Sequence, residues 1–248
     1  MRKIIYEEDN ILLDEGSFFG KSIFETILWL KGPIFLKEHI ERLKTGLNVL
    51  KLKPLEEDEL IKFLRGLEVK NKGIKVMVTP LNIVITKRDI TYKSEDYKRG
   101  FSLKLSNVKR NSSSCLTYIK STCYIENILE KEKMKKLGFD DVLFLNERGF
   151  VTETSCSNIF IIKNERIITP KIENGLLGGI IRKWAIKNFK VQEEDILYED
   201  LESADEVFIT NSLMGIMKVN RIDEFIYDNE LYTNSIKEAY DKFIYNNK

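Results

Sequence analysis

The sequence predicts a mixed α/β (α+β) protein with a small N-terminal α/β domain and a barrel-like C-terminal domain. The first hundred residues alternate strand-like runs with two amphipathic helical patterns. Residues 106–116 are polar and serine-rich, without periodicity, as in a linker. Many short strand-like runs and few helices follow, which indicates a barrel-like or strongly twisted sheet. We therefore expect an N-terminal domain over 1–107, a linker over 108–116 and a C-terminal domain over 117–248.

Composition narrows the class of protein. The 248 residues include 40 basic and 39 acidic side chains, a net charge of +1, and no basic stripe suggests a nucleic-acid partner. Acids at positions 7–9 interrupt any signal-peptide core, and no apolar run approaches the length of a membrane span. We therefore expect a cytoplasmic protein.

The three cysteines, Cys115, Cys123 and Cys156, show no metal-binding spacing. Without a CxxC or Cys/His pattern, we expect buried reduced thiols and neither a disulfide framework nor a metal site.

The N-terminal elements follow from hydrophobic periodicity. Residues 23–30 form a strand-like run, and a turn at 31–33 leads into a second short strand, IFL. Leucine and isoleucine recur at helical spacing over 37–50, and a second helical pattern after Pro54 carries Leu60, Leu64 and Leu67. Further strands are expected over 74–79 and 82–86 and at the alternating Phe101, Leu103 and Leu105.

The C-terminal half begins with a predicted helix over 125–137. Its mainly apolar face is expected to carry Ile125, Ile128, Leu129, Glu132 and Met134. Short strands are expected over 142–145, 150–153, 158–162, 167–168, 206–210 and 216–219. Helices are expected from about residue 180 and over 233–244.

Two features suggest chemistry. Glu153 is a lone carboxylate in an uncharged run, followed by a hairpin-like segment and by Gly178-Gly179, which open an apolar helix carrying Arg182. Lys120 is the only charged residue between Arg110 and Glu126. Desolvation there favours the neutral amine that a Schiff base requires. A lysine that extends from a strand end to water is the alternative.

Together these residues resemble the signature of the class IV pyridoxal-phosphate (PLP) enzymes. The family comprises branched-chain aminotransferases, D-amino acid aminotransferases and aminodeoxychorismate lyases. The matching positions are Glu153, Ser155, Asn158-Ile159-Phe160, Ile167-Ile168-Thr169, Leu177, Gly179, Ile180 and Arg182. The resemblance implies two α/β domains with the cofactor in the cleft between them, and a homodimer that acts on a small molecule.

The resemblance also implies residue roles. Lys120 corresponds to the Schiff-base lysine and acid/base group, and Glu153 to the carboxylate against the pyridine nitrogen. Tyr124 is placed to reach the phenolic oxygen of PLP, with Asn127 a weaker candidate. His39 is interpreted as a structural hydrogen-bonding residue.

The phosphate of PLP requires backbone N–H groups and a cation. The helix start at Gly179, Ile180 and Ile181 suits an anion because its first N–H groups are free and its dipole is positive there. The resemblance implies that Arg42 in the segment EHIERL binds the phosphate, where a surface ion pair is the alternative. The resemblance further implies phosphate contacts from Asn211 and Ser212, and a bracing role for Arg182.

Three positions depart from the family pattern. Ile181 stands where the family often has threonine, Leu28 where branched-chain aminotransferases carry arginine, and Lys218 where they commonly have proline. Thr26, on the strand of Leu28, aligns with the region where lyases place a hydroxyl near the substrate. Whether Arg99, Arg110 or a main-chain group binds the substrate carboxylates stays open.

Two reactions fit these residues. We favour a 4-amino-4-deoxychorismate lyase that yields 4-aminobenzoate, a folate precursor, and pyruvate. The reasons are the short chain, the loss of arginine at Leu28 and the segment TNSLMGIMKV, which resembles the lyases' second phosphate loop. The alternative is an aminotransferase acting on branched-chain or D-amino acids with 2-oxoglutarate. A catalytically silent PLP-binding or interaction protein is a third possibility.

Overall fold

The chain forms two compact units. The computed structural model describes residues 1–8 and 10–246. Unit 1 comprises Met1–Thr91, Ile119–Tyr124 and the end of the chain from Ile244, and unit 2 comprises Tyr92–Tyr118 and Ile125–Phe243. The sheet expected in each half of the chain is present, which confirms the mixed α/β fold class.

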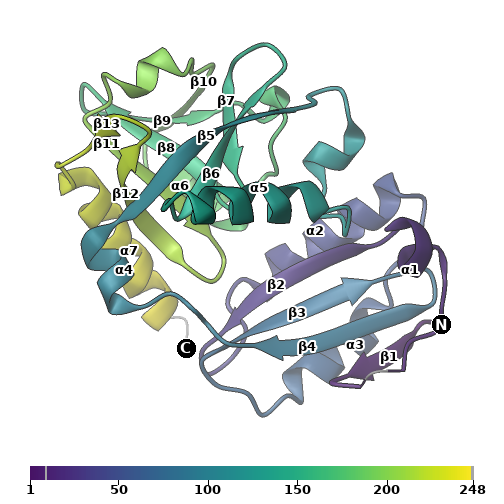
Figure 1. Cartoon of the computed structure of the whole chain (residues 1–248). Helices are drawn as coiled ribbons and strands as arrows, with labels where there is room; N and C mark the ends of the chain where they lie inside the picture. The colour runs from purple at the N-terminus through teal and green to yellow at the C-terminus, as the bar shows by residue number, and fades with distance from the viewer. Residues whose placement is uncertain (9, 247–248) are drawn as a thin grey trace. The chain divides into compact units, whose positions relative to one another are not determined.

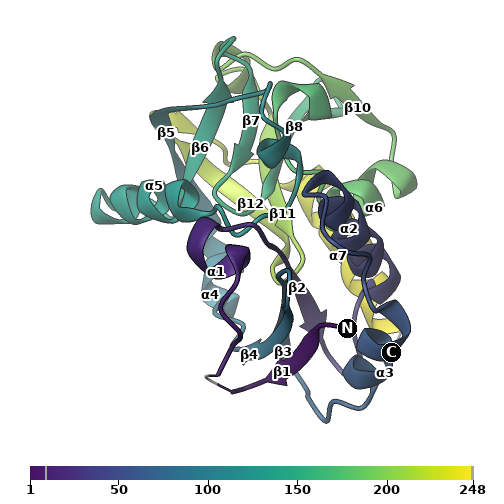
Figure 2. The same ribbon diagram turned by 90° about the vertical axis from the view of Figure 1, so that its right-hand side faces the viewer.

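Unit 1 is built on a four-stranded sheet in the order β1-β4-β3-β2. Its strands are β1 (Lys3–Tyr6), β2 (Ile23–Trp29), β3 (Lys72–Val78) and β4 (Asn82–Arg88). Its helices are α1 (Glu15–Phe19), α2 (Leu36–Val49) and α3 (Glu57–Arg65). The last two lie against one face of the sheet (Figures 1 and 2).

Alternation along β2 determines which side chains enter this core. Ile23, Ile27 and Trp29 are buried together with Leu43 and Leu47 of α2. The predicted strand 23–30 and helix 37–50 are therefore confirmed. The expected second strand, IFL, is wrong, because α2 already begins at Leu36 and only an isolated bridge joins Trp29 to Pro33.

Unit 2 contains a nine-stranded sheet that closes on itself. Its strands are β5 (Phe101–Arg110), β6 (Asp141–Asn146), β7 (Val151–Thr154), β8 (Asn158–Lys163), β9 (Arg166–Pro170), β10 (Val191–Glu194), β11 (Glu206–Asn211), β12 (Gly215–Ile222) and β13 (Phe225–Ile226). The path β8-β11-β12-β5-β6-β7 becomes a ring where β7 pairs again with β8, at Glu153 and Asn158. This ring is the barrel-like sheet that the sequence predicts.

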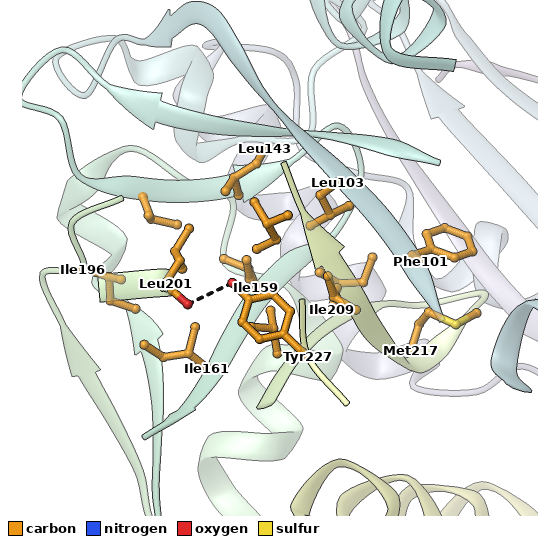
Figure 3. Packing of buried hydrophobic residues seen from close by; sticks show 14 of the residues in the cluster. Phe101, Leu103, Leu143, Ile159, Ile161, Ile196, Leu201, Ile209, Met217 and Tyr227 are labelled. Atoms are coloured by element: carbon orange, nitrogen blue, oxygen red, sulfur yellow. Dashed lines mark hydrogen bonds between the residues drawn. The ribbon is translucent and has the colours of Figure 1, made fainter. Parts of the chain in front are cut away.

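Alternate side chains of all six ring strands form one apolar cluster. It includes Leu103, Leu143, Ile159, Ile209 and Met217, all buried. Figure 3 shows the ring of Tyr227 among them, with its hydroxyl donating to the carbonyl of Leu201 at 2.9 Å.

The helices of unit 2 surround this sheet. They are α4 (Ser94–Arg99), α5 (Ile125–Lys136), α6 (Ile180–Asn188) and α7 (Leu231–Asn246), with short 3-10 turns at Cys115–Tyr118, Ile172–Asn174 and Glu199–Leu201. α5 contacts β5 and β6, and α6 contacts β10 and β11. Across the described residues, no helix combines the length and apolar character needed to span a bilayer.

The chain does not divide where the serine-rich stretch suggested. The expected irregular linker is wrong for residues 106–110, because β5 runs to Arg110 and pairs with β6 and β12 of the large sheet. Residues 119–124, expected in the C-terminal domain, cluster with unit 1. Backbone pairing with β2 accounts for this placement.

Two predictions about burial are also wrong. On α5 the buried residues are Asn127, Glu130 and Met134, whereas Ile125 and Leu129 of the expected apolar face are 63% and 56% exposed. The cysteines are unpaired as expected, but Cys115 and Cys123 are exposed and Cys156 is half-buried.

Candidate functional site

Lys120 is held against the edge strand of the small sheet. The amide of Phe24 donates to the carbonyl of Lys120 at 2.8 Å, and Thr122 donates to the carbonyl of Ser22 at 3.0 Å. Ser121 forms an isolated antiparallel bridge with Ile23. The segment therefore acts as a short extra strand beside β2, which fixes the backbone that carries Lys120.

Two aromatic rings flank the Lys120 amine. Its Nζ lies 4.5 Å from the ring centre of Phe24 and 5.3 Å from that of Tyr124, and these rings meet edge to face at 5.5 Å. Cation–π attraction holds an ammonium in such a position. The structure thus brings together Lys120 and Tyr124, two of the predicted site residues.

Arg42 takes part in an ion pair with the buried carboxylate of Glu25. The carboxylate of Glu25, 1% exposed, accepts from Nε and Nη2 of Arg42 at 2.6 and 2.7 Å and from Nδ1 of His39 at 2.7 Å. Burial raises the pKa of Glu25, but Arg42 and His39 outweigh it and bring this pKa to about 2. Arg42 is therefore a half-buried side chain with one guanidinium edge fixed by Glu25, not a surface ion-pair residue.

His39 is held in one tautomer. Burial lowers the pKa of His39 more than Glu25 raises it, so the imidazole is neutral at pH 7. Because a carboxylate only accepts, Nδ1 carries the proton. This hydrogen bond matches the expected structural role of His39, and its buried Nε2 has no hydrogen-bond partner among the described residues.

Lys75 is a candidate site residue that the sequence reasoning missed. It pairs in register with Thr26 across β3 and β2, and its Nζ lies 4.6 Å from the ring centre of Phe24. Burial, followed by repulsion from Arg88, lowers the pKa of Lys75. Both lysines thus contact the Phe24 ring, and Thr26 is the one residue of β2 that is not buried. A lone lysine in the otherwise apolar run IKVMV was the available signal.

Glu153 is the predicted site carboxylate in unit 2. It lies on β7, and its Oε2 accepts from the amide of Leu177 at 3.1 Å. Its side chain is 13% exposed, and Oε1 lies 3.7 Å from Nη2 of Arg110. The carboxylate is therefore oriented by the backbone before Gly178 and lies close to a buried cation.

The start of α6 combines free helix N–H groups with a close contact at glycine. Gly179 is the N-cap, and no side chain among the described residues caps this end of the helix. A Cβ built on Gly179 would overlap Oδ1 of Asn158, whose Nδ2 donates to the carbonyl of Leu177 at 2.8 Å. Ile180 and Ile181 bury their side chains, so only their backbone faces an anion here.

The remaining predicted residues of unit 2 support this region. Asn211 donates to Tyr92 and Ser157, and its Oδ1 accepts from the amides of Leu213 and Met214, so its side chain shapes the turn after β11. Ser212 lies half-buried in that turn.

Arg182 has the bracing contacts expected of it. Its Nη2 donates to the carbonyl of Pro170 and to Glu193 at 2.8 and 2.6 Å, which links α6 to β9 and β10.

Comparison with known proteins identifies the class to which this chain belongs. Residues 22–222 match the family Amino-transferase class IV, and the chain belongs to that family. A "Probable branched-chain-amino-acid aminotransferase" of Aquifex aeolicus is 30% identical over 88% of this chain and 81% of its own length. An "Aminodeoxychorismate lyase" of Bacillus subtilis is 28% identical over 97% and 92%.

Solved structures have the same fold. The branched-chain aminotransferase of the archaeon Thermoproteus uzoniensis superposes with a TM-score of 0.84, covering 96% of this chain and 90% of that one at 24% identity. The similarity concerns the fold. Relatives with both activities therefore fit the chain, and the reaction has to be argued from its own residues.

The adjacent Gly178 and Gly179 provide a matched test of the close backbone contact at the start of α6. Gly179→Ala is expected to displace Asn158 and to destabilise the protein by about 1–3 kcal/mol, since overpacking costs this much. Gly178→Ala is the control, because its Cβ would find its nearest neighbour, Lys183, at 3.6 Å. Thermal unfolding measures the loss of stability, and binding of a phosphate-containing ligand measures the effect on the anion site. Equal behaviour of the two variants would contradict a steric requirement for glycine at position 179.

Proposed function

We propose that the protein is a PLP-dependent 4-amino-4-deoxychorismate lyase, which produces 4-aminobenzoate and pyruvate. The observation that carries the proposal is that Lys120 and Lys75 both lie over the Phe24 ring, with Thr26 beside Lys75 in the sheet register. This arrangement combines an amine for proton transfer with a hydroxyl and a second cation. This combination suits a substrate with two carboxylates. Leu28, 6% exposed, offers no charge at the position where branched-chain aminotransferases carry arginine.

The residues present fit PLP by their chemistry. Uncapped N–H groups at the start of α6 and the sterically required Gly179 suit a phosphate. Glu25 fixes the orientation of the Arg42 guanidinium, and a planar guanidinium of this kind is suited to phosphate. Ser212, with the turn that Asn211 shapes, would complete the phosphate contacts.

Each remaining group has a defined task in this proposal. When bound, PLP supplies an electron sink for the substrate α-carbon. Lys120 would attach the cofactor and then accept the α-proton, which leaves with the three-carbon product as the ring becomes aromatic. Glu153 would favour protonation of the ring nitrogen, and Tyr124 would donate to the phenolic oxygen.

The aminotransferase alternative uses the same residues. The Aquifex aeolicus relative favours this alternative, and transfer of an amino group requires an oxo acid such as 2-oxoglutarate. The lyase needs no second substrate, because enolpyruvate leaves and the ring becomes aromatic. The requirement for an oxo acid therefore separates the two activities.

The requirement for an oxo acid can be tested directly. Purified protein loaded with PLP is expected to convert 4-amino-4-deoxychorismate to 4-aminobenzoate and pyruvate without an oxo acid. Lys120→Ala should lose turnover by several orders of magnitude and keep its fold, because proton transfer and covalent attachment both use this amine. The exposed Lys171→Ala is the control. Yellow protein that forms no 4-aminobenzoate but transfers amino groups from branched-chain or D-amino acids would establish the aminotransferase instead.

Lys75 is expected to bind a substrate carboxylate. Lys75→Met should raise KM about ten- to a hundredfold with a smaller change in kcat, since a hydrogen bond to a charged group contributes ~1.5–3 kcal/mol. The same change should raise thermal stability, because the half-buried ammonium is disfavoured by burial. Lys72→Met is the control, at the exposed end of the same strand. Unchanged KM in Lys75→Met would remove this residue from the substrate site.

We also propose a homodimer. Exposed apolar side chains cluster in unit 1 at Leu12, Leu13, Phe18 and Phe19, which are 48–78% exposed, and in unit 2 on α5. Several large apolar side chains exposed close together in sequence are a feature of interfaces. Sedimentation at micromolar concentration should give a dimer, and Phe18→Asp with Phe19→Asp should shift it towards monomer, whereas Leu231→Asp should not. A fully active wild-type monomer would contradict the dimer.

A further inference from the structure

Arg110 is a buried cation next to the signature carboxylate. It is the last residue of β5 and is 8% exposed. Its guanidinium carbon lies 3.9 Å from the ring centre of Phe144, a stacking contact that fixes the plane of the group. Its position is therefore set by packing as well as by charge.

The hydrogen bonds of Arg110 are incomplete. Nη1 donates to Oδ1 of Asn127 at 3.1 Å and lies 3.4 Å from Glu126, whose side chain is more than half exposed. Nε and Nη2 have no hydrogen-bond partner within the described part of the chain, and Nη2 is the atom 3.7 Å from Oε1 of Glu153. The charged groups facing Arg110 are thus Glu126 from α5 and Glu153 from β7.

A purely structural ion pair is expected to close more tightly. Buried arginine normally satisfies its donors, because an unpaired buried donor is costly. In the same unit, Arg182 reaches Glu193 at 2.6 Å, although its Nε, like that of Arg110, is buried with no hydrogen-bond partner among the described residues. The pairing of Arg110 with Glu153 is near enough for strong electrostatic coupling and too long for a hydrogen bond.

We propose that Arg110 is a positioning residue that moderates the negative charge of Glu153 towards the ring nitrogen of PLP. The inference rests on the proposed PLP site. A carboxylate alone would keep the ring nitrogen protonated over a wide pH range, whereas a neighbouring guanidinium offsets part of that charge. Arg110 would thereby set the strength of the electron sink without contacting the substrate.

The ring nitrogen of bound PLP reports this effect directly. With PLP labelled by nitrogen-15 in the ring, its NMR shift against pH gives the midpoint at which the nitrogen loses its proton. Arg110→Met should raise this midpoint by about one pH unit or more, in line with the effect of one nearby charge. Arg110→Lys should stay within about half a unit of wild type, because it keeps the charge.

Two further variants control for misfolding of Arg110→Met and for a general effect of removing one positive charge. Arg110→Gln can still donate to Asn127, so it carries the same expectation if Arg110→Met does not fold. Arg99→Met removes an equal charge from the exposed ion pair with Asp140 and should leave the midpoint unchanged.

The outcomes separate the inference from the proposed function. A midpoint in Arg110→Met and Arg110→Gln that falls, or that equals those of wild type and Arg99→Met, would overturn the role of Arg110 while PLP binding stands. A wild-type protein that takes up no PLP, with no visible absorbance and no labelled signal, would overturn both.

Discussion

Each compact unit pairs a glutamate of low exposure with an arginine, Glu25 with Arg42 in unit 1 and Glu153 with Arg110 in unit 2. Buried charge is tolerated only when it is compensated, so each glutamate dictates what surrounds it. In unit 1, Glu25 joins β2 to α2 through Arg42 and His39 at 2.6–2.7 Å. In unit 2, Glu153 lies 3.7 Å from Arg110. The first pair joins two elements by short hydrogen bonds, whereas the second is held at a longer distance.

Much of the fold could be predicted because its core elements follow simple periods. The strand at 23–29 and the helix at 36–49 bury the residues that alternation and helical spacing select. The helix α5 shows why such reasoning fails elsewhere. Its buried face contains Asn127 and Glu130, which bond to the carbonyl of Ser155 and the hydroxyl of Ser106. Tertiary hydrogen bonds thus outweighed the apolar pattern.

The limits of the domain assignment have a similar origin. Residues 106–110 look irregular in sequence, yet they continue β5 because strands from distant parts of the chain pair with it. Residues 119–124 likewise acquire their place from the free edge of β2. Local composition does not predict pairing partners of this kind. It did single out Lys120, which is a lone charge in an uncharged run.

Lys120, Glu153 and Gly179 could be proposed as site residues from the sequence because residue type, spacing and family resemblance point to them together. Lys75 and Arg110 needed the register of the sheets, because only the structure places them beside Phe24 and Glu153. Unpaired polar atoms do not by themselves mark function, since Trp184 and Tyr240 also bury one each. Charged groups of the same unit differ in how fully they are paired: Glu206 accepts from two backbone N–H groups, whereas Arg182 pairs with Glu193 and keeps a buried Nε without a hydrogen-bond partner among the described residues. A site that must accept another charged group would give the 3.7 Å spacing between Arg110 and Glu153 a physical reason.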